Sequence, residues 1–421
     1  MSAVPASAEV LVVGAGMAGL TAAKSLRDSG IGVRVIEARD RVGGRIHTVR
    51  ESGQAPRELG AQVVHGAAHP VFTVVDRDRE ATHIDGGELA ARMHVDDLRL
   101  PLDGTAPVIG PMAALRRLRN LPRVMGPLAG QLPVPAAAEI ARIDERGLRA
   151  LGQWVEQVSG VPLERLTVDR VVSDPALSPP PGEKYLLNDG MSAVPQRLAQ
   201  GLEVTVGSPV AAIALCDNAV RVTLRSGQEL TAALVVLTVP PPVIAAGLIA
   251  LPDLPADQRQ AAAALTAAPA VVVHVSLVAP AQDHGFVFDV ELGFATWHRG
   301  EQHLTVVSKG RQAGRTAEWA RDPARMRAWA GRLPGVTPAP EGEITAYDWG
   351  TDPYALGGFT IAPEPSDPVA DIWRRPIGGR IVIAGEAALA DAGHPYLDRA
   401  ARSGELAADA VRRLHPRKAV A

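Results

Sequence analysis

Residues 9–26 read EVLVVGAGMAGLTAAKSL, an apolar strand that runs into three spaced glycines and then into an amphipathic helix. Gly14, Gly16 and Gly19 fit G-x-G-x-x-G, which allows a tight turn, close approach of a pyrophosphate, and close helix–strand packing. The unpaired N–H groups at the start of the helix favour phosphate. A second strand, IGVRVIE, ends in Glu37, where a carboxylate can accept hydrogen bonds from a ribose hydroxyl. The stretch predicts a dinucleotide site and leaves NAD and FAD open.

The composition narrows the class of protein. The 421 residues allow two or three domains. A total of 43 basic against 46 acidic residues gives no electrostatic reason to expect nucleic acid or an anionic membrane surface as partner. A single cysteine, Cys216, excludes an internal disulfide framework and fits a reducing compartment. The first nine residues show no signal-peptide pattern, so we expect a cytoplasmic protein.

Residues 231–252 carry no charge and are long enough to be considered as a transmembrane helix. Three consecutive prolines at 240–242 break it, and the β-branched run ALVVLTV before them is typical of a buried strand. The sequence therefore predicts no transmembrane helix.

The rest of the chain alternates between helical and strand-rich segments. We expect a helical insertion over 106–172, short strands from 202, a strand block over 270–308, one helix over 314–332, a strand over 342–348, and a closing strand and helix (about 395–414). The closing strand IVIAGEA and the opening strand imply one domain assembled from distant segments, with a ligand pocket against a second domain. The predicted dinucleotide-binding domain comprises 1–85, 187–255 and 375–421, and the substrate domain comprises 86–186 and 256–374.

The segment after the second strand carries a family resemblance. EARDRVGGRIHT at 37–48 resembles the flavin-containing amine oxidase family, which includes monoamine oxidases and L-amino-acid oxidases. Further segments resemble family elements in the expected order: ELGAQVVHG (58–66), LNDGMSAVPQRLA (187–199), ALVVLTVPP (233–241), IVIAGEA (381–387) and YLDRAARSGELAA (396–408). The resemblance implies an α/β fold: a Rossmann-type, GR2-like FAD-binding domain built from discontinuous segments, with a mixed-sheet and helical substrate domain.

The resemblance also assigns cofactor residues. Arg39 and Arg45 would lie near the diphosphate, because a planar guanidinium suits paired phosphate oxygens. The start of the last helix would point its dipole at the flavin ring and stabilise the reduced form. Family members that attach flavin covalently use a cysteine where Gly358 stands here, so we expect noncovalent FAD. The residues assigned to FAD are Gly14, Gly16, Gly19, Glu37, Ala38, Arg39, Gly44, Arg45, Gly60, Ala61, Gln62, Val210, Glu386 and Leu397.

On the substrate side, the resemblance implies an aromatic cage of Phe359 and Tyr396 around the amine of a small amine or amino-acid-like molecule. His394 is a candidate base or polar anchor, with a plain loop residue as the alternative. The implied reaction moves a hydride from the amine-bearing carbon to flavin N5, followed by imine hydrolysis and reoxidation by dioxygen to hydrogen peroxide.

Two departures from the family pattern leave alternatives open. Val272 stands where many members carry a lysine near N5, which favours a dehydrogenase or desaturase of C–N or C–C bonds with poor oxygen use. Arg399 replaces a glycine near the flavin edge and either binds a substrate carboxylate or lies on the exposed side of the helix. A flavoprotein with structural FAD is a third interpretation. His65 lies beside the ring-facing strand, and His274 is expected to be a satisfied core histidine.

Overall fold

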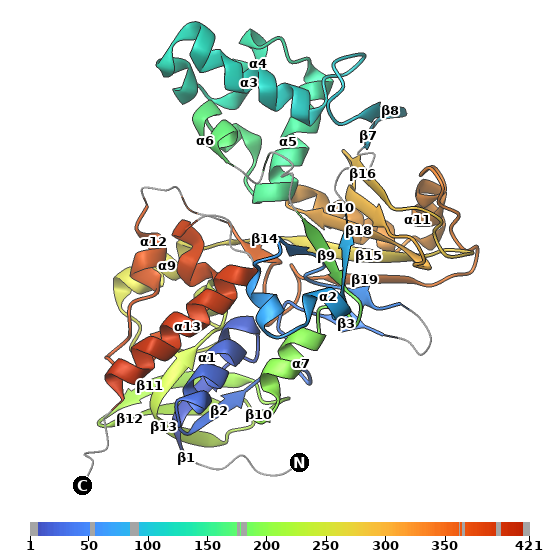
Figure 1. The fold of residues 1–421 in the computed structure, drawn as a ribbon. Coiled ribbons are helices and arrows are strands. Elements are labelled where there is room, and N and C mark those ends of the chain that lie inside the picture. The colour runs from blue at the N-terminus through green and yellow to red at the C-terminus, as the bar shows by residue number, and fades with distance from the viewer. Residues whose placement is uncertain are drawn as a thin grey trace.

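The computed structural model describes residues 7–50, 55–84, 92–174, 177, 183–361, 363, 367–392 and 397–415. Two seven-stranded sheets form its framework, and a group of helices extends from the second sheet (Figure 1).

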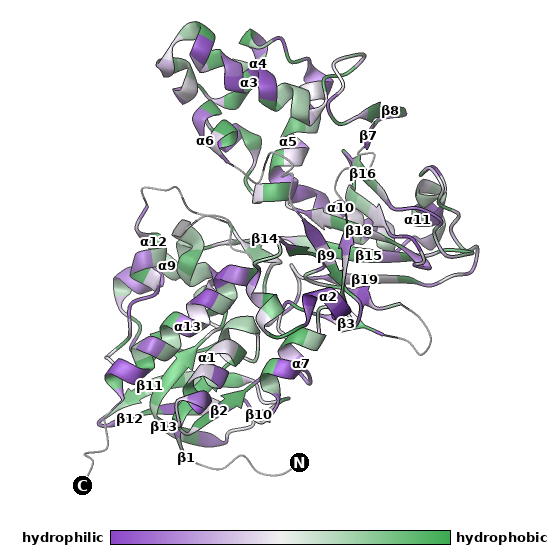
Figure 2. Ribbon diagram, in the orientation of Figure 1, coloured by the Kyte–Doolittle hydropathy of each residue, from purple (hydrophilic) through white to green (hydrophobic). Residues whose placement is uncertain are grey.

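The first sheet includes the strand of the opening stretch, residues 9–26, and the helix of that stretch packs on the sheet. Its strand order is β10-β2-β1-β13-β12-β11, with β21 paired to β13. The central strands are parallel, whereas β11 and β12 are antiparallel to their neighbours. Figure 2 shows apolar residues along β13, as expected for a strand covered on both faces. The strands are β1 (Ser7–Val13), β2 (Val33–Ile36), β10 (Glu203–Thr205), β11 (Val210–Cys216), β12 (Ala219–Leu224), β13 (Glu229–Leu237) and β21 (Ile381–Ile383).

Helices from both ends of the chain cover one face of this sheet. The first helix, α1 (Met17–Asp28), packs against the last, α13 (Leu397–Leu414), and both share a core with β1. The remaining helices of this half are α7 (Ala193–Ala199), α8 (Pro241–Ala245), α9 (Ala256–Ala264) and α12 (Val369–Trp373), with the 3-10 segment η5 (Glu386–Ala392) before α13.

The uncharged stretch 231–252 forms most of β13 and then α8, with Pro240 as the N-cap of α8 and Pro241 and Pro242 in its first turn. Among the described residues, no helix is long and apolar enough to cross a membrane.

The second sheet has the order β19-β15-β18-β17-β16-β7-β8 and is antiparallel except where β16 pairs with β7. The single helix expected over 314–332 is wrong: Asp322 caps a new helix by accepting from the Arg325 N–H, and Pro323 opens it. The elements are β7 (Arg92–Val95), β8 (Leu98–Pro101), β15 (Ala270–Ser276), β16 (Gly285–Asp289), β17 (Gly293–Trp297), β18 (His303–Lys309), β19 (Ile344–Asp348), α10 (Arg311–Ala320) and α11 (Pro323–Ala330).

The helical segment expected over 106–172 is present and packs on the second sheet through Trp154 and Phe288, whose rings lie 5.3 Å apart. Its helices are α3 (Pro111–Met125), α4 (Val134–Ile140), α5 (Glu145–Ser159) and α6 (Val168–Ser173), with the 3-10 turns η2 (Pro127–Gln131) and η3 (Leu163–Arg165).

Short strand pairs, one 3-10 turn and one short helix complete the fold. The domain bounds given in the sequence analysis stay a prediction. The small elements are β3 (Thr48–Val49) with β4 (Arg57–Glu58), β5 (Val64–His65) and β6 (Ala81–Ile84) on either side of β9 (Lys184–Leu187), β14 (Ala267–Ala268) with β20 (Phe359–Thr360), η1 (Pro70–Thr73) and α2 (Arg77–Glu80).

Candidate active site

A cavity of about 1910 Å³ is lined by residues of the first sheet, the second sheet and the helical segment. Of the residues expected to bind FAD, Gly19 alone does not line this cavity; a Cβ there would overlap the Gly14 carbonyl, which fits its expected packing role. The residues that do line it are Gly14, Gly16, Glu37, Ala38, Arg39, Gly44, Arg45, Gly60, Ala61, Gln62, Val210, Glu386 and Leu397.

The glycine turn leaves an open cradle at the start of α1. Gly14 has a φ of 108°, and a Cβ there would overlap Oγ1 of Thr238. A Cβ on Gly44 would lie 3.3 Å from the Gly16 Cα. The N-cap residue, Gly16, offers no side-chain cap to the first N–H groups of α1. Space and free donors of this kind suit a pyrophosphate.

Glu37 joins the turn to the second strand. Its buried carboxylate accepts the N–H of Ala15 at 2.7 Å and the N–H of Arg39 at 2.9 Å. An ionised carboxylate has about four acceptor positions. The two that remain fit the ribose hydroxyls expected at this place.

Arg39 lies at the cavity, but its charge is already compensated. Its Nη2 donates to Asp352 Oδ1 at 2.6 Å, and its guanidinium lies 5.3 Å from the ring centroid of Tyr354. Asp352 also accepts from the Tyr347 hydroxyl. Sequence reasoning missed Asp352, because it comes from a distant segment and no local pattern marks it. Arg41 was also missed. It holds the turn at Gly43 and Gly44 by donating to the carbonyls of Gly44 and Ile46.

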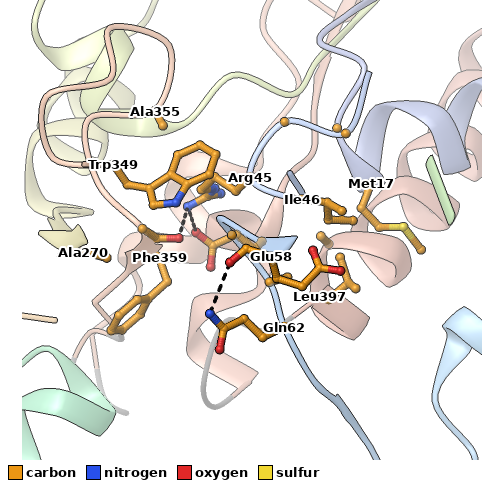
Figure 3. A pocket seen from close by; sticks show the side chains of 18 of the residues that line it. Met17, Arg45, Ile46, Glu58, Gln62, Ala270, Trp349, Ala355, Phe359 and Leu397 are labelled. Carbon is orange, nitrogen blue, oxygen red and sulfur yellow. Dashed lines mark hydrogen bonds and ion pairs between the residues drawn. The ribbon is translucent and has the colours of Figure 1, made fainter. Parts of the chain in front are cut away.

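Arg45 lies near Trp349 and Phe359 at the cavity (Figure 3), and its partner Glu386 also lines the cavity. Glu386 Oε1 accepts from Arg45 Nη1 at 2.8 Å and from the N–H and hydroxyl of Thr360 at 2.9 and 2.6 Å. Its Oε2 is buried and has no partner among the described residues. A buried carboxylate oxygen without a donor is costly. It therefore fits a hydroxyl or water donor supplied when a cofactor is bound.

Phe359 lines the cavity, as expected, next to Trp349, whose indole N–H donates to the Leu59 carbonyl at 2.7 Å. Tyr396 and His394 lie outside the described residues, so the aromatic cage and the candidate base stay predictions. Arg399 lines the cavity rather than the outer side of α13, and its Nε lies 3.8 Å from Asp398 Oδ2.

The wall of the second sheet is built from alternating residues. On β15, Ala270 and Val272 line the cavity, as the prediction for Val272 requires. His274 is a satisfied core histidine: Nε2 lies 2.9 Å from the Glu58 carbonyl and Nδ1 3.0 Å from Thr305 Oγ1, and burial lowers its pKa to about 3. The strands β17 and β18 contribute Phe294, Thr296, His303, Thr305, Val307 and Lys309, and His298 follows the end of β17.

Lys309 is a third residue that sequence reasoning missed. Its backbone pairs with Ala270, and Val307 pairs with Val272, so its amine reaches the wall on which Val272 lies from the adjacent strand. Burial lowers the pKa of Lys309 to about 8. The alternation from His303 to Lys309 was the available signal, but the expected strand ended one residue too early.

Several titratable groups at the cavity have shifted pKa values. Burial raises the pKa of Glu58 and of Glu301 to about 7. Burial lowers the pKa of His65 and of His298 to about 4, so both imidazoles are neutral at pH 7. Within the described ranges, no group of three or more His, Cys, Asp or Glu residues could hold a metal ion.

Comparisons with known proteins identify the relatives of this chain. A family model for flavin containing amine oxidoreductases matches residues 17–412. Polyamine oxidase 2 of Arabidopsis thaliana is 27% identical over 416 residues, which cover 90% of this chain and 83% of that protein. Among solved structures, cyclohexylamine oxidase from Brevibacterium oxydans IH-35A has a TM-score of 0.75 at 22% identity, covering 97% of this chain and 99% of that chain. A putrescine oxidase triple mutant redesigned in cofactor binding has a TM-score of 0.72 at 22% identity, with the same coverage.

The structural likeness confirms the α/β fold class. Because the family model spans most of the chain, the expected resemblance is confirmed, and the protein belongs to the flavin-containing amine oxidoreductase family, whose enzymes act on CH–NH or CH–NH₂ groups.

Proposed function

We propose that the protein binds FAD noncovalently and oxidises a small or medium-sized amine, with dioxygen as the electron acceptor. One observation carries this proposal: a single cavity joins the glycine cradle and Glu37 to the wall around Phe359. A cofactor lying along the first part would place its reactive end at the second. The relatives named for polyamine, putrescine and cyclohexylamine oxidation support an amine as the substrate.

The residues at the cavity fit each part of FAD. The turn at Gly14 and the start of α1 would hold the pyrophosphate, and Glu37 the ribose. Glu386, with its free oxygen, and the backbone N–H of Leu397 would face the flavin end. The sole cysteine, Cys216, is not among the cavity-lining residues, which supports noncovalent binding. Bound FAD would supply the two-electron acceptor for oxidation of the amine-bearing carbon and pass the electrons to dioxygen.

The chain itself would orient the amine and exclude water. Phe359, with Tyr396 as the expected second ring, would flank the reacting carbon. The apolar wall of Ala270, Val272 and Phe294 favours the unprotonated amine, because burial disfavours the charged form. Water then converts the imine product to a carbonyl compound. The net reaction consumes amine, water and dioxygen and releases carbonyl compound, ammonia or a shorter amine, and hydrogen peroxide.

A second candidate follows from Val272, which offers no amine to position a water on its strand. On this alternative, the protein is a dehydrogenase or desaturase with slow oxygen use.

The deciding experiment is anaerobic mixing of the purified holoprotein with putrescine, spermidine, cyclohexylamine and amino acids, followed by air. Bleaching of the flavin absorbance and rapid recovery with peroxide release support the oxidase. Bleaching with slow recovery supports the second candidate. Flavin that no amine or amino acid bleaches contradicts amine oxidation and points to C–C desaturation or structural FAD.

The expected role of Phe359 can be tested by Phe359→Ala. Loss of the ring should lower kcat/KM for the best substrate by roughly 100-fold, because misplacement of about 1 Å has that effect. The flavin absorbance per protein should stay unchanged. Phe72→Ala is the control, since Phe72 packs on Tyr185 and does not line the cavity. Unchanged turnover in Phe359→Ala would show that this ring does not contact the substrate.

A further inference from the structure

Two of the four lysines in the chain line the same cavity. Of the other two, Lys24 pairs with Asp28 at 2.7 Å on the surface, and Lys418 lies outside the described residues. Within the described part of the chain, neither Lys184 Nζ nor Lys309 Nζ has a hydrogen bond or an ion pair. Burial lowers the pKa of both amines. The positive charge of each lysine also lowers the pKa of His65, so both lie near that imidazole. The two lysine amines at the cavity therefore have no directly paired carboxylate among the described residues.

Three carboxylates that line the cavity already have partners among the described residues. Glu386 is held by Arg45 and Thr360, and Glu58 accepts from Met191 N–H at 2.6 Å and Thr48 Oγ1 at 2.8 Å. Asp398 lies beside Arg399, the cation that the sequence had offered as a carboxylate partner. Lys184 and Lys309 are half-buried at the cavity, so an anionic group of a ligand can pair with them without displacing an existing partner.

Lys309 is fixed beside the expected reaction centre. Its Nζ lies 5.1 Å from the ring centroid of Phe359. Its backbone N–H donates to Gln157 Oε1 at 2.7 Å, and the amide of Gln157 donates to the Val307 carbonyl. Gln157 is fully buried on α5. The helical segment therefore holds the end of β18, and with it the ammonium group, next to Phe359.

An apolar compartment continues along the same wall. Val307 pairs with Phe294 across the strands, and the Phe294 ring lies 5.3 Å from both Phe286 and Trp154. All four side chains line the cavity. A ligand bound at Lys309 whose other end extends into this compartment would contact aromatic rings.

From this arrangement we infer that the substrate is an α-amino acid with an apolar or aromatic side chain, whose carboxylate binds Lys309. Lys184 adds positive charge to the same part of the cavity. In an α-amino acid the carboxylate is one bond from the reacting carbon, which matches a cation next to Phe359. A polyamine would instead bring a second positive charge toward the two lysines. The inference rests on the proposed function and names its substrate class.

Binding can be tested without turnover, using 3-phenylpropionate and its uncharged amide as probes of the oxidised holoprotein. Flavin difference spectra should show binding of the acid and much weaker binding of the amide. Lys309→Met should weaken binding of the acid roughly 10- to 100-fold, because a hydrogen bond to a charged group is lost. Lys309→Arg should recover part of it. Lys24→Met is the control and should change nothing.

Turnover separates this inference from the function on which it rests. L- and D-phenylalanine are compared with 2-phenylethylamine, which lacks only the carboxylate. An amino acid should be the better substrate, and Lys309→Met should raise its KM at least tenfold while leaving the KM of the amine unchanged. Equal binding of the acid and the amide, or an equal loss for both substrates in Lys309→Met, would overturn the carboxylate site. Turnover of amines alone would overturn it and leave amine oxidation standing. Binding of 3-phenylpropionate without flavin reduction by any substrate would contradict the proposed function instead.

Discussion

At the scale of single residues, the cavity depends on buried carboxylates held by donors from distant segments. Glu58 is one example: Thr48 donates to one of its oxygens, and the Met191 N–H donates to the other, which joins the β3–β4 pair to the turn before α7. Burial nevertheless raises its pKa, and the charge of Glu301 adds to the effect. Sequence motifs located Glu58 within ELGA, but its protonation depends on burial that the motif does not encode.

The pH dependence of stability should reveal Glu58. Its pKa rises from about 4.5 to about 7 on folding, so the folded protein binds more protons than the unfolded chain between these values. The contribution of Glu58 to the free energy of unfolding is therefore fully present below pH 4.5 and is lost as the pH rises through about 7. Relative to wild type, Glu58→Gln should gain about 2–3 kcal/mol between pH 4.5 and 7.5, measured by urea unfolding of the holoprotein.

The buried histidines shift the wild-type curve in the opposite direction, because their pKa values are lowered on folding. They are common to both proteins and cancel in the difference. Glu341→Gln, at an exposed position, is the control and should follow wild type at every pH. A constant difference between Glu58→Gln and wild type would mean that Glu58 is ionised throughout this range.

At the scale of elements, local patterns succeeded where the determining residues are neighbours in sequence. The strand and helix of residues 9–26 appear as β1 and α1 because Gly14, at a φ of 108°, allows the tight turn between them. Local patterns failed at 314–332, where Asp322 and Pro323 divide one apolar pattern into α10 and α11. They also failed at Lys309, because its place depends on the register of β18 with β15. Cross-strand register is a tertiary property that one strand's sequence does not specify.

The turn between β1 and α1 gives the prediction at this scale. Gly14→Ala should lower stability by more than about 2 kcal/mol and reduce the flavin bound per protein, because the new Cβ meets Thr238 in a left-handed conformation. Gly30→Ala is the matched control: it also has positive φ, but no atom lies within 4 Å of its Cβ position. It should cost about 1 kcal/mol and keep full flavin occupancy. Equal behaviour of the two variants in urea unfolding and visible absorbance would show that overlap with Thr238 adds nothing to the cost of a positive φ at Gly14.

At the scale of the whole molecule, the site requires contacts between segments hundreds of residues apart. Arg39 meets Asp352, and Arg45 meets Glu386, across more than 300 positions. The family elements predicted that these segments share one fold, and most of the expected cofactor residues do line one cavity. The pairings themselves were not predictable, since a single sequence shows which charges exist and not which ones meet. The same limit hid Lys184 and Lys309 at the cavity, because the absence of a hydrogen bond or ion pair from them to the described residues is a property of the folded chain.

Closure of the chain, in which the last helix packs on the first, can be tested at Gly404. A Cβ at Gly404 on α13 would overlap the Ala18 carbonyl on α1. Gly404→Ala should therefore lose about 1–3 kcal/mol despite the better helix propensity of alanine. It should also release flavin at lower urea concentration, because α13 begins at the cavity with Leu397. Gly314→Ala on α10 is the matched control, with open space at its Cβ, and should be neutral or gain up to about 1 kcal/mol. If both variants unfold together with unchanged flavin release, the contact between the first and last helices does not hold the site.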